Sequence, residues 1–125
     1  MSQISLGLSH ELMDKGIAVN CLWSRTAVAT AAVANELGGE SMTNKSRLDS
    51  IMGDSAYEIL TTNSKECTGQ FFIDDEVLAS VGCKDFSKYR VNKSGDEDEL
   101  FPDFFLETRT GVLKHLSEIE QASRK

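Results

Sequence analysis

The sequence has little of what marks membrane, disulfide-rich or nucleic-acid-binding proteins. Its 125 residues include three cysteines, one proline and two histidines. No apolar run approaches the roughly 18 residues that a membrane-spanning helix needs, so we expect no membrane span. The 13 basic residues against 20 acidic ones give a net charge of -7, which repels phosphate and excludes a nucleic-acid partner. With 40% hydrophobic residues, the chain is expected to form one acidic domain with a packed core.

The cysteines and histidines are too scattered for a disulfide framework or a metal site. Cys21, Cys67 and Cys83 are odd in number and form no CxxC pair, which favours a reducing, intracellular compartment. His10 and His115 each stand apart from any cysteine at zinc-finger spacing. We therefore predict no metal ligands in this sequence.

Hydrophobic periodicity predicts helices that alternate with strands. Apolar residues every three or four positions are typical of amphipathic helices, and short, continuous apolar runs are typical of buried strands. The first predicted helix covers 2–15 and ends at Gly16, and the second covers 30–37 and ends at Gly38 and Gly39. The third is a core-facing helix that begins at Asp49 or Ser50 and ends at Leu60. The predicted strands cover 17–23, expected to be buried on both faces, and 69–73, which Asp74, Asp75 and Glu76 end.

The remaining segments are predicted from their polar composition. A polar loop is expected over 40–47 and a short helical turn over 76–82. The acidic run 94–99 predicts a solvated loop, with a contact to a cation or a partner as the alternative. A last amphipathic helix is expected over 107–125, with its apolar stripe on Val112, Leu113, Leu116 and Ile119.

The order of these elements favours an α/β fold. If the two strands are parallel, the helices between them form a crossover connection, and the sheet needs helices on each face. Two strands of this buried type make a poor sheet alone, so we expect this chain to be part of a larger sheet.

Several short strings resemble the short-chain dehydrogenase/reductase family. The segment 17–30 resembles the sixth strand and following loop of that family, and Trp23 with its threonine- and alanine-rich continuation is similar to the hydroxysteroid dehydrogenase-like branch. Three more strings follow in the order of that branch, at 54–57, 68–76 and 101–105. The resemblance implies the C-terminal part of a doubly wound Rossmann-type parallel sheet, with about two strands and three or four helices. It divides the chain into residues 1–106, a partial domain that lacks the N-terminal dinucleotide-binding half, and the helix 107–125.

The resemblance also implies a cofactor site, for NAD or NADP in the complete family. The cofactor-binding residues that it implies are Ser24, Arg25, Thr26, Ala27, Val28 and Thr30. Ser24 replaces the family proline, which predicts a less preorganised pocket wall, and Arg25 replaces glycine or lysine. Arg25 either meets a cofactor phosphate or, the favoured alternative, is an exposed, solvated arginine. By the resemblance, residues 30–47 correspond to the substrate lid of the family. Gly38 and Gly39 would then act as a hinge of the lid, or, as the alternative, would only end a helix.

The catalytic residues of the family are not found in this sequence. Neither Tyr57 nor Tyr89 is followed four residues later by lysine, and the nine glycines form no phosphate-binding string. We therefore expect a fragment of an oxidoreductase that acts on a small, steroid-like or lipid-like alcohol or ketone. By itself, this fragment is expected to be inactive and to bind the cofactor poorly. The alternative is a non-catalytic module that binds a partner, another copy or a full-length relative. The resemblance implies a peroxisome or mitochondrion, and otherwise the cytoplasm.

Overall fold

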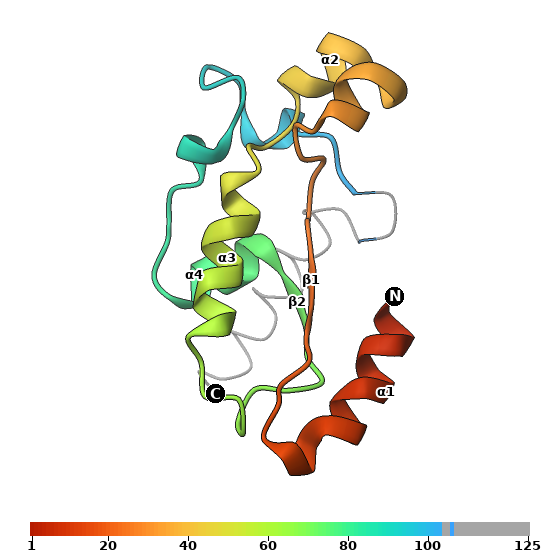
Figure 1. The fold of residues 1–125 in the computed structure, drawn as a ribbon. Helices are drawn as coiled ribbons and strands as arrows, with labels where there is room; N and C mark the ends of the chain where they lie inside the picture. Colours follow the sequence, from red (N-terminus) through yellow and green to blue (C-terminus); the bar gives the residue numbers. More distant parts are fainter. Residues whose placement is uncertain (104–105, 107–125) are drawn as a thin grey trace, which may run out of the picture.

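The computed structural model describes residues 1–103 and 106 (Figure 1). Two short parallel strands lie among the helices, which confirms an α/β arrangement. The predicted helix over 107–125 lies outside the described residues. In chain order the elements are α1 (Ser2–Leu12), the 3-10 turn η1 (Met13–Lys15), β1 (Cys21–Trp23), the π-helical turn η2 (Val33–Leu37), α2 (Gly39–Asn44), α3 (Ser50–Leu60), β2 (Phe71–Ile73), α4 (Asp74–Ser80) and the 3-10 turns η3 (Ser87–Tyr89) and η4 (Glu97–Glu99).

The first helix forms where its apolar repeat predicts it. Helix α1 continues into η1, and the pair ends at Gly16 as expected. Its apolar stripe is not covered by the described residues, because Ile4 is 62% exposed and Leu8 is 41% exposed. In this helix only Ser9 is buried, and Ser9 and Leu6 lie on the side that faces Gly69.

The two strands pair in parallel, as predicted, but they are shorter than the apolar runs that predicted them. Cys21 lies opposite Phe71, and Trp23 lies opposite Ile73. The expected burial of the first strand on both faces is wrong, because all three residues of β1 are partly exposed and Ile17 is 49% exposed. The physical reason is that the sheet has two strands among the described residues, so one edge of β1 has no neighbouring strand there.

Asn20 fixes the approach of the two strands. Its Nδ2 donates a hydrogen bond to the Cys67 carbonyl at 3.0 Å, and its Oδ1 accepts one from the Gln70 amide at 3.0 Å. Both bonds join segments about 50 positions apart in the sequence. They give this asparagine a structural role, because they join the two strand segments.

Helices α3 and α4 pack against each other and form the small apolar core. Its centre is Ile51 of α3, Leu78 of α4 and the ring of Tyr89. Helix α3 begins at the predicted position, with Asp49 as the residue before it. Its last residue departs from the predicted core-facing stripe, because Leu60 is 82% exposed.

The polar loop predicted over 40–47 is wrong, because α2 occupies most of it. Met42 is the one apolar residue of this polar stretch, and its burial gives the helix a packed side. Gly38 lies against it, since a Cβ on Gly38 would come within 2.5 Å of the Met42 Cβ. The Thr43 hydroxyl donates to the Gly39 carbonyl at 2.9 Å. One buried apolar side chain next to a glycine is therefore enough to order this stretch.

The second correction concerns the acidic triplet 74–76, predicted only to end the second strand. These residues are the first turn of α4, which begins two residues before the predicted helical turn over 76–82. Carboxylates are favoured there because the N-terminal end of a helix carries a partial positive charge. Asp74 and Asp75 are nevertheless buried, so they need partners beyond the helix itself.

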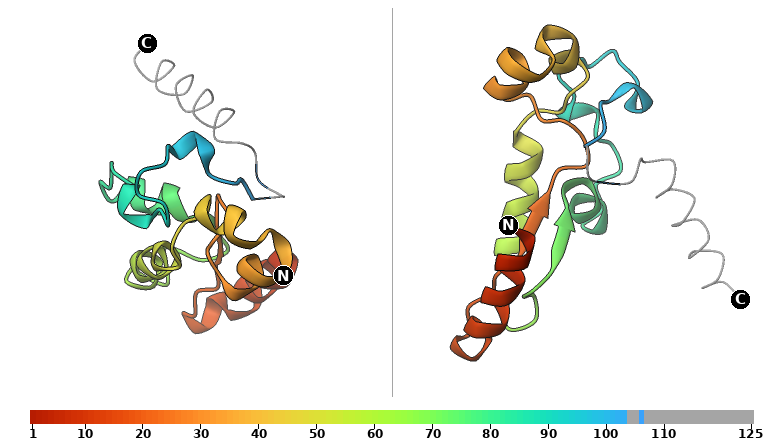
Figure 2. Two further views of the ribbon diagram at one scale, coloured as in Figure 1. Left: turned by 90° about the horizontal axis from the view of Figure 1, so that it is seen from above. Right: turned by 90° about the vertical axis from the view of Figure 1, so that its right-hand side faces the viewer.

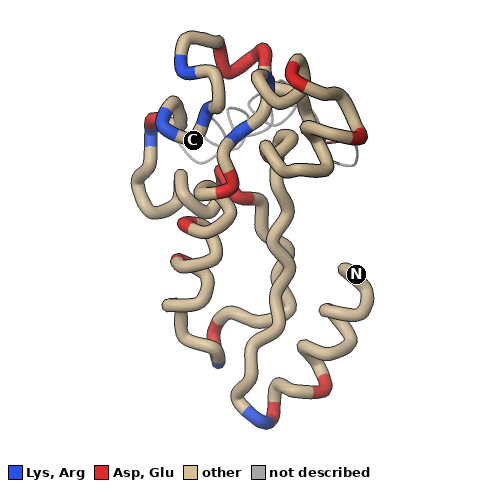
Figure 3. Tube along the Cα trace, turned by 45° about the horizontal axis from the view of Figure 1, so that its top comes forward, with Lys and Arg blue, Asp and Glu red and all other residues tan. Residues whose placement is uncertain are grey.

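The loops that follow the strands gather at one end of the molecule. Both strands run toward α2 and the segment 87–103, while α1 lies beside the other end of β1 (Figures 1 and 2). Lysine, arginine, aspartate and glutamate concentrate around this end, and the trace of β1 carries none of them (Figure 3). The structure therefore places a charged cluster just beyond the carboxyl ends of the strands.

We predict that Gly69→Ala lowers stability and that Gly53→Ala does not. Gly69 has a φ of +70°, and a Cβ there would lie 3.0 Å from the buried Ser9 Oγ, so alanine should cost about 1–2 kcal/mol. Gly53 lies inside α3 with no heavy atom within 4 Å of a built Cβ, and alanine there should add about 0.5–1 kcal/mol. Urea unfolding followed by circular dichroism measures both changes. Shifts of the same sign in the two variants would contradict the prediction.

Candidate functional site

The loop 24–30 follows the carboxyl end of β1 and is held from two sides. On one side, the Arg25 amide donates to Asp74 Oδ1 at 3.0 Å. On the other, the Ala27 amide donates to the Phe101 carbonyl at 2.8 Å, and the Ala29 amide donates to the Arg47 carbonyl at 2.8 Å. Residues from three separate parts of the sequence thus fix the loop backbone.

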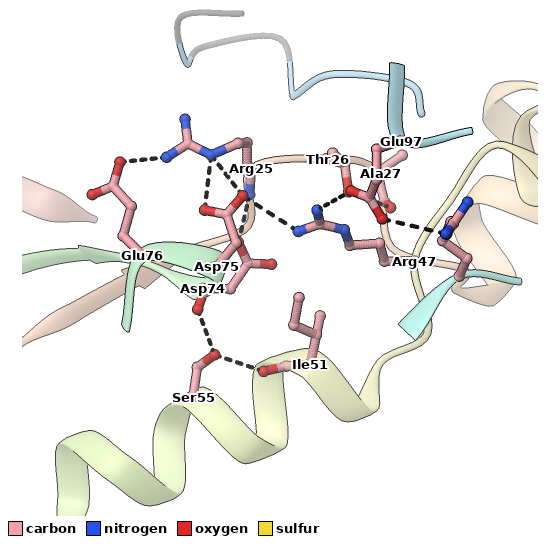
Figure 4. Close-up of polar contacts among 11 residues, drawn as sticks. Arg25, Thr26, Ala27, Arg47, Ile51, Ser55, Asp74, Asp75, Glu76 and Glu97 are labelled. Carbon is pink, nitrogen blue, oxygen red and sulfur yellow. Dashed lines mark hydrogen bonds and ion pairs between the residues drawn. The ribbon is translucent and has the colours of Figure 1, made fainter. Parts of the chain in front are cut away.

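The Arg25 side chain lies inside the molecule. It is 4% exposed, so the favoured expectation of a solvated arginine is wrong. Its Nε donates to both oxygens of Asp75, at 2.8 and 2.9 Å, and its Nη2 donates to Glu76 (Figure 4). Burial by itself lowers the pKa of Arg25, but the hydrogen bonds and charges of these two carboxylates outweigh it and raise that pKa. Arg25 is therefore a fixed cation within the fold.

Asp75 is shared between two guanidinium groups. Its Oδ1 and Oδ2 accept from Arg25, and its Oδ2 also lies 3.5 Å from Arg47 Nη1 (Figure 4). Arg47 is fully buried, and its Nη2 donates to Glu97 Oε2 at 2.8 Å. The Arg47 guanidinium also lies 5.3 Å from the centre of the Phe86 ring, a cation–π distance. The described part of the chain therefore encloses a connected ionic cluster, not separate surface pairs.

The acidic run 94–99 takes part in this cluster. Glu97 Oε1 lies 3.3 Å from Arg90 Nε, in addition to the bond from Arg47. The prediction of a solvated loop therefore fails at Glu97, although Asp98 and Glu99 are exposed. The cations that Glu97 meets belong to the same chain, so this run serves internal pairing.

Asp74 lies beneath the loop and is fully buried. Its Oδ1 accepts from the amides of Arg25 and Asp75, at 3.0 and 2.8 Å. Its carbonyl accepts from the Ser55 hydroxyl at 2.9 Å, which ties α4 to α3. Burial raises the pKa of Asp74, and the two amide hydrogen bonds lower it by less.

The residues implied as cofactor contacts lie along this one loop. Their exposure increases along the chain, from the buried pair Arg25 and Thr26 to the exposed Thr30. The Thr30 Oγ1 accepts a hydrogen bond from the Val33 amide at 3.4 Å, at the start of the lid segment. The role of Ser24, Arg25, Thr26, Ala27, Val28 and Thr30 in holding a cofactor stays a prediction.

Sequence reasoning missed the partners of this loop. Asp74 and Asp75 were assigned only to a strand end, and Arg47 only to a lid segment. The one available signal was Arg25 itself, a cation directly after an apolar run, together with an acidic triplet directly after the second apolar run. If both runs are neighbouring parallel strands, the residues that follow them meet at the same edge of the sheet.

The described tyrosines are not arranged for proton transfer to a substrate. The Tyr89 hydroxyl donates to Asp54 Oδ2 at 2.6 Å, and Lys88 Nζ lies 4.6 Å from the ring centre. Burial and the bond to Asp54 raise the pKa of Tyr89, which makes it a poorer acid at neutral pH. Tyr57 is exposed on α3. Within residues 1–103 and 106, no three histidine, cysteine or acidic side chains form a metal-binding group, and no helix has the length and apolar character to cross a membrane.

Comparisons with known proteins relate this geometry to one class of enzyme. The chain is 44% identical over 113 residues to hydroxysteroid dehydrogenase-like protein 2 of Xenopus laevis, covering 90% of this chain and 26% of that protein. It is 40% identical over 107 residues to the human protein of the same name, covering 86% of this chain and 24% of that protein. No protein-family profile matches the chain.

Two solved structures share its fold. A short-chain dehydrogenase from Mycobacterium thermoresistibile superposes with a TM-score of 0.73 and 39% identity, over 86% of this chain and 37% of that one. A protein from Xanthomonas campestris described as a dehydrogenase superposes with a TM-score of 0.76 and 42% identity, over 86% of this chain and 38% of that one.

The chain is thus a C-terminal part of the short-chain dehydrogenase/reductase fold, an oxidoreductase architecture. Within that class, its sequence is similar to part of hydroxysteroid dehydrogenase-like protein 2. The chain spans about a quarter of the length of these curated relatives.

The raised pKa of Asp74 predicts a pH-dependent effect of Asp74→Asn. A carboxyl group with a raised pKa holds its proton more tightly in the folded state. Its contribution to stability is therefore present below about pH 4, the ordinary pKa of aspartate, and is lost as the pH rises through the raised value. Asparagine stays neutral and can still accept both amide hydrogen bonds.

The free energy of unfolding of Asp74→Asn, relative to the wild type, should therefore rise between pH 4 and pH 7. Urea unfolding at a series of pH values measures this difference. Asp14→Asn, which removes an exposed carboxylate in η1, is the matched control and should give a smaller slope. A relative free energy for Asp74→Asn that falls with pH would contradict the assignment.

Proposed function

We propose that this chain is part of an NAD(P)-dependent short-chain oxidoreductase that interconverts an alcohol and a ketone of steroid-like or lipid-like character. Loop 24–30 is proposed as one wall of the nicotinamide pocket. In doubly wound sheets, ligands bind outside the carboxyl ends of the strands, and this loop directly follows β1. A reducing compartment, whether cytoplasm, peroxisome or mitochondrion, fits the free Cys21, Cys67 and Cys83.

The observation that carries this proposal is the direction of the Val28 amide. Arg47 pairs with the loop through its backbone, donating to the Ala27 carbonyl at 2.9 Å and accepting from the Ala29 amide at 2.8 Å. In such a parallel bridge, the N–H group of Val28, the residue between Ala27 and Ala29, is directed to the opposite side. The Val28 N–H therefore faces away from Arg47, and it donates no hydrogen bond to the described residues.

An outward amide at this place fits the carboxamide oxygen of a nicotinamide ring. The Thr30 hydroxyl, two residues further on, accepts from Val33 and keeps its own hydrogen to donate to a phosphate oxygen. Bound there, the nicotinamide would supply hydride transfer. The residues of this chain would orient the ring and one phosphate.

The proposal includes inactivity of the chain by itself. Reduction of a carbonyl needs an acid that delivers a proton to its oxygen. Tyr89 already donates its hydroxyl hydrogen to Asp54, and Tyr57 has no lysine four residues later. We therefore expect no turnover of NADH or NADPH by the 125-residue chain with a ketone substrate.

Titration of the labelled chain with NADH and NADPH, followed by NMR, tests this proposal. Binding by this chain alone is expected to be weak, so the cofactor is added in large excess. The Val28 and Thr30 amide signals should then shift, and the Ile17 signal, at the other end of the strand segment, should not. Thr30→Val should weaken the binding by about 3- to 10-fold, because one hydrogen bond is lost. Thr61→Val, which removes an exposed hydroxyl after α3, is the control. Shifts absent from the loop, or ketone-dependent oxidation of the cofactor, would contradict the proposal.

A second candidate function is self-association, and one surface favours it. A groove of about 600 Å³ lies between the segment 16–22 and α3, and its lining is mostly apolar. Ile17 and Leu60 line it and are 49% and 82% exposed. The neighbouring edge of β1 has no strand partner among the described residues. An apolar groove beside an open strand edge favours pairing with a second copy of the chain.

Leu60→Lys should weaken this association, because it places a charge in the groove. Sedimentation equilibrium should give a dissociation constant at least about 10-fold larger than that of the wild type. Val81→Lys, at another exposed apolar residue outside this groove, should leave the constant unchanged. A wild-type chain that stays monomeric at all concentrations would rule out this candidate.

A further inference from the structure

The loop that carries the Val28 amide has Ser24 where the family resemblance implies a proline, and contacts with other segments hold it. Ser24 stands at that position, so the backbone loses one source of stiffness. The contacts that take its place come from side chains. They meet at Asp75, which faces Arg25 on one side and Arg47 on the other.

Arg47 links this charge cluster to the loop backbone. Its side chain is held by Asp75 and by Glu97. Its backbone forms the bridge that turns the Val28 amide outward. Arg47 thus contacts α4 through its side chain and sets the direction of the Val28 amide through its backbone.

Arg25 closes the cluster from within the loop. Its amide is held by Asp74 and its side chain by Asp75, so backbone and side chain are tied to the same turn of α4. The side chains of Arg25, Arg47 and Asp75 are 5%, 0% and 11% exposed. At this burial, water and salt screen the charges little, so loss of Asp75 leaves Arg25 only the half-exposed Glu76 and leaves Arg47 only Glu97 as a counterion.

We propose that Asp75 is a positioning residue, which fixes the Val28 amide in its outward direction by pairing at once with Arg25 and Arg47. This inference rests on the proposed cofactor site, because it names what holds that site in place. It does not assign Asp75 a contact with the cofactor.

Hydrogen exchange of the full chain, measured by NMR, tests this role. The Ala29 and Arg47 amides form the bridge to be tested. In Asp75→Asn, which removes the charge and keeps the shape, both should exchange at least about 10-fold faster than in the wild type. The amides of α3 report global unfolding and should change less. Asp75→Glu keeps the charge and should restore most of the protection.

Three further variants separate the explanations. Glu76→Gln removes a partner of Arg25 whose side chain is 49% exposed, so it should loosen the loop less, and it serves as the test if Asp75→Asn does not fold. Asp14→Asn makes the same charge change at an exposed site and should leave both amides protected. The exchanged pair Arg25→Asp with Asp75→Arg should fail to restore protection, because the new arginine would face Arg47.

The outcomes distinguish the positioning role from the cofactor site. Unchanged exchange in Asp75→Asn, equal exchange in the Asn and Glu variants, or rescue by the exchanged pair would overturn the positioning role. If the bridge loosens as expected and NADH shifts the Val28 signal less than in the wild type, both proposals are supported. If the bridge loosens but NADH shifts no loop signal even in the wild type, the cofactor site is wrong and the positioning role stands.

Discussion

The arrangement of this chain depends on one carboxylate that faces two buried guanidinium groups. Asp75 begins α4 together with Asp74, and through Arg25 and Arg47 it joins the loop after β1 to the segment before α3. Breaking a buried ion pair by removing one partner costs up to about 3–5 kcal/mol, and the remaining pairs of Arg25 with Glu76 and of Arg47 with Glu97 reduce that penalty here. The apolar core around Ile51 is small, so a penalty of this size is large for the fold.

The distribution of buried side chains is consistent with a fold held by this ionic cluster. Several of the most deeply buried side chains are polar or charged: Ser9, Ser46, Arg47, Ser55 and Asp74. Large apolar side chains such as Leu60 and Phe71 remain exposed. In an isolated small domain the opposite is usual. This pattern fits a part of a larger sheet. In such a part, the polar groups at one end pair with one another, and the apolar faces pack against other elements.

The local features of this fold could be predicted, and the distant pairings could not. The repeat of apolar residues predicts α1 and α3, and the two apolar runs predict the strands, because these signals lie within a few residues of one another; the parallel pairing came from the family resemblance. The pairing of Arg25 with Asp75 spans 50 positions, and no periodicity connects them. The same limit explains α2, where the polar composition predicts a loop and gives no sign that Met42 packs against Gly38.

The ionic cluster also bears on how the strands find their register. The pairing of Trp23 with Ile73 sets Arg25 opposite the acidic turn. A slip of one residue would turn successive side chains to the other face of the sheet. Arg25 would then lose its contact with Asp75, and its buried guanidinium would need another counterion. The charged groups that hold the loop therefore also disfavour a wrong register of the two strands. The strands have three residues each, so their own hydrogen bonds distinguish little between one register and another.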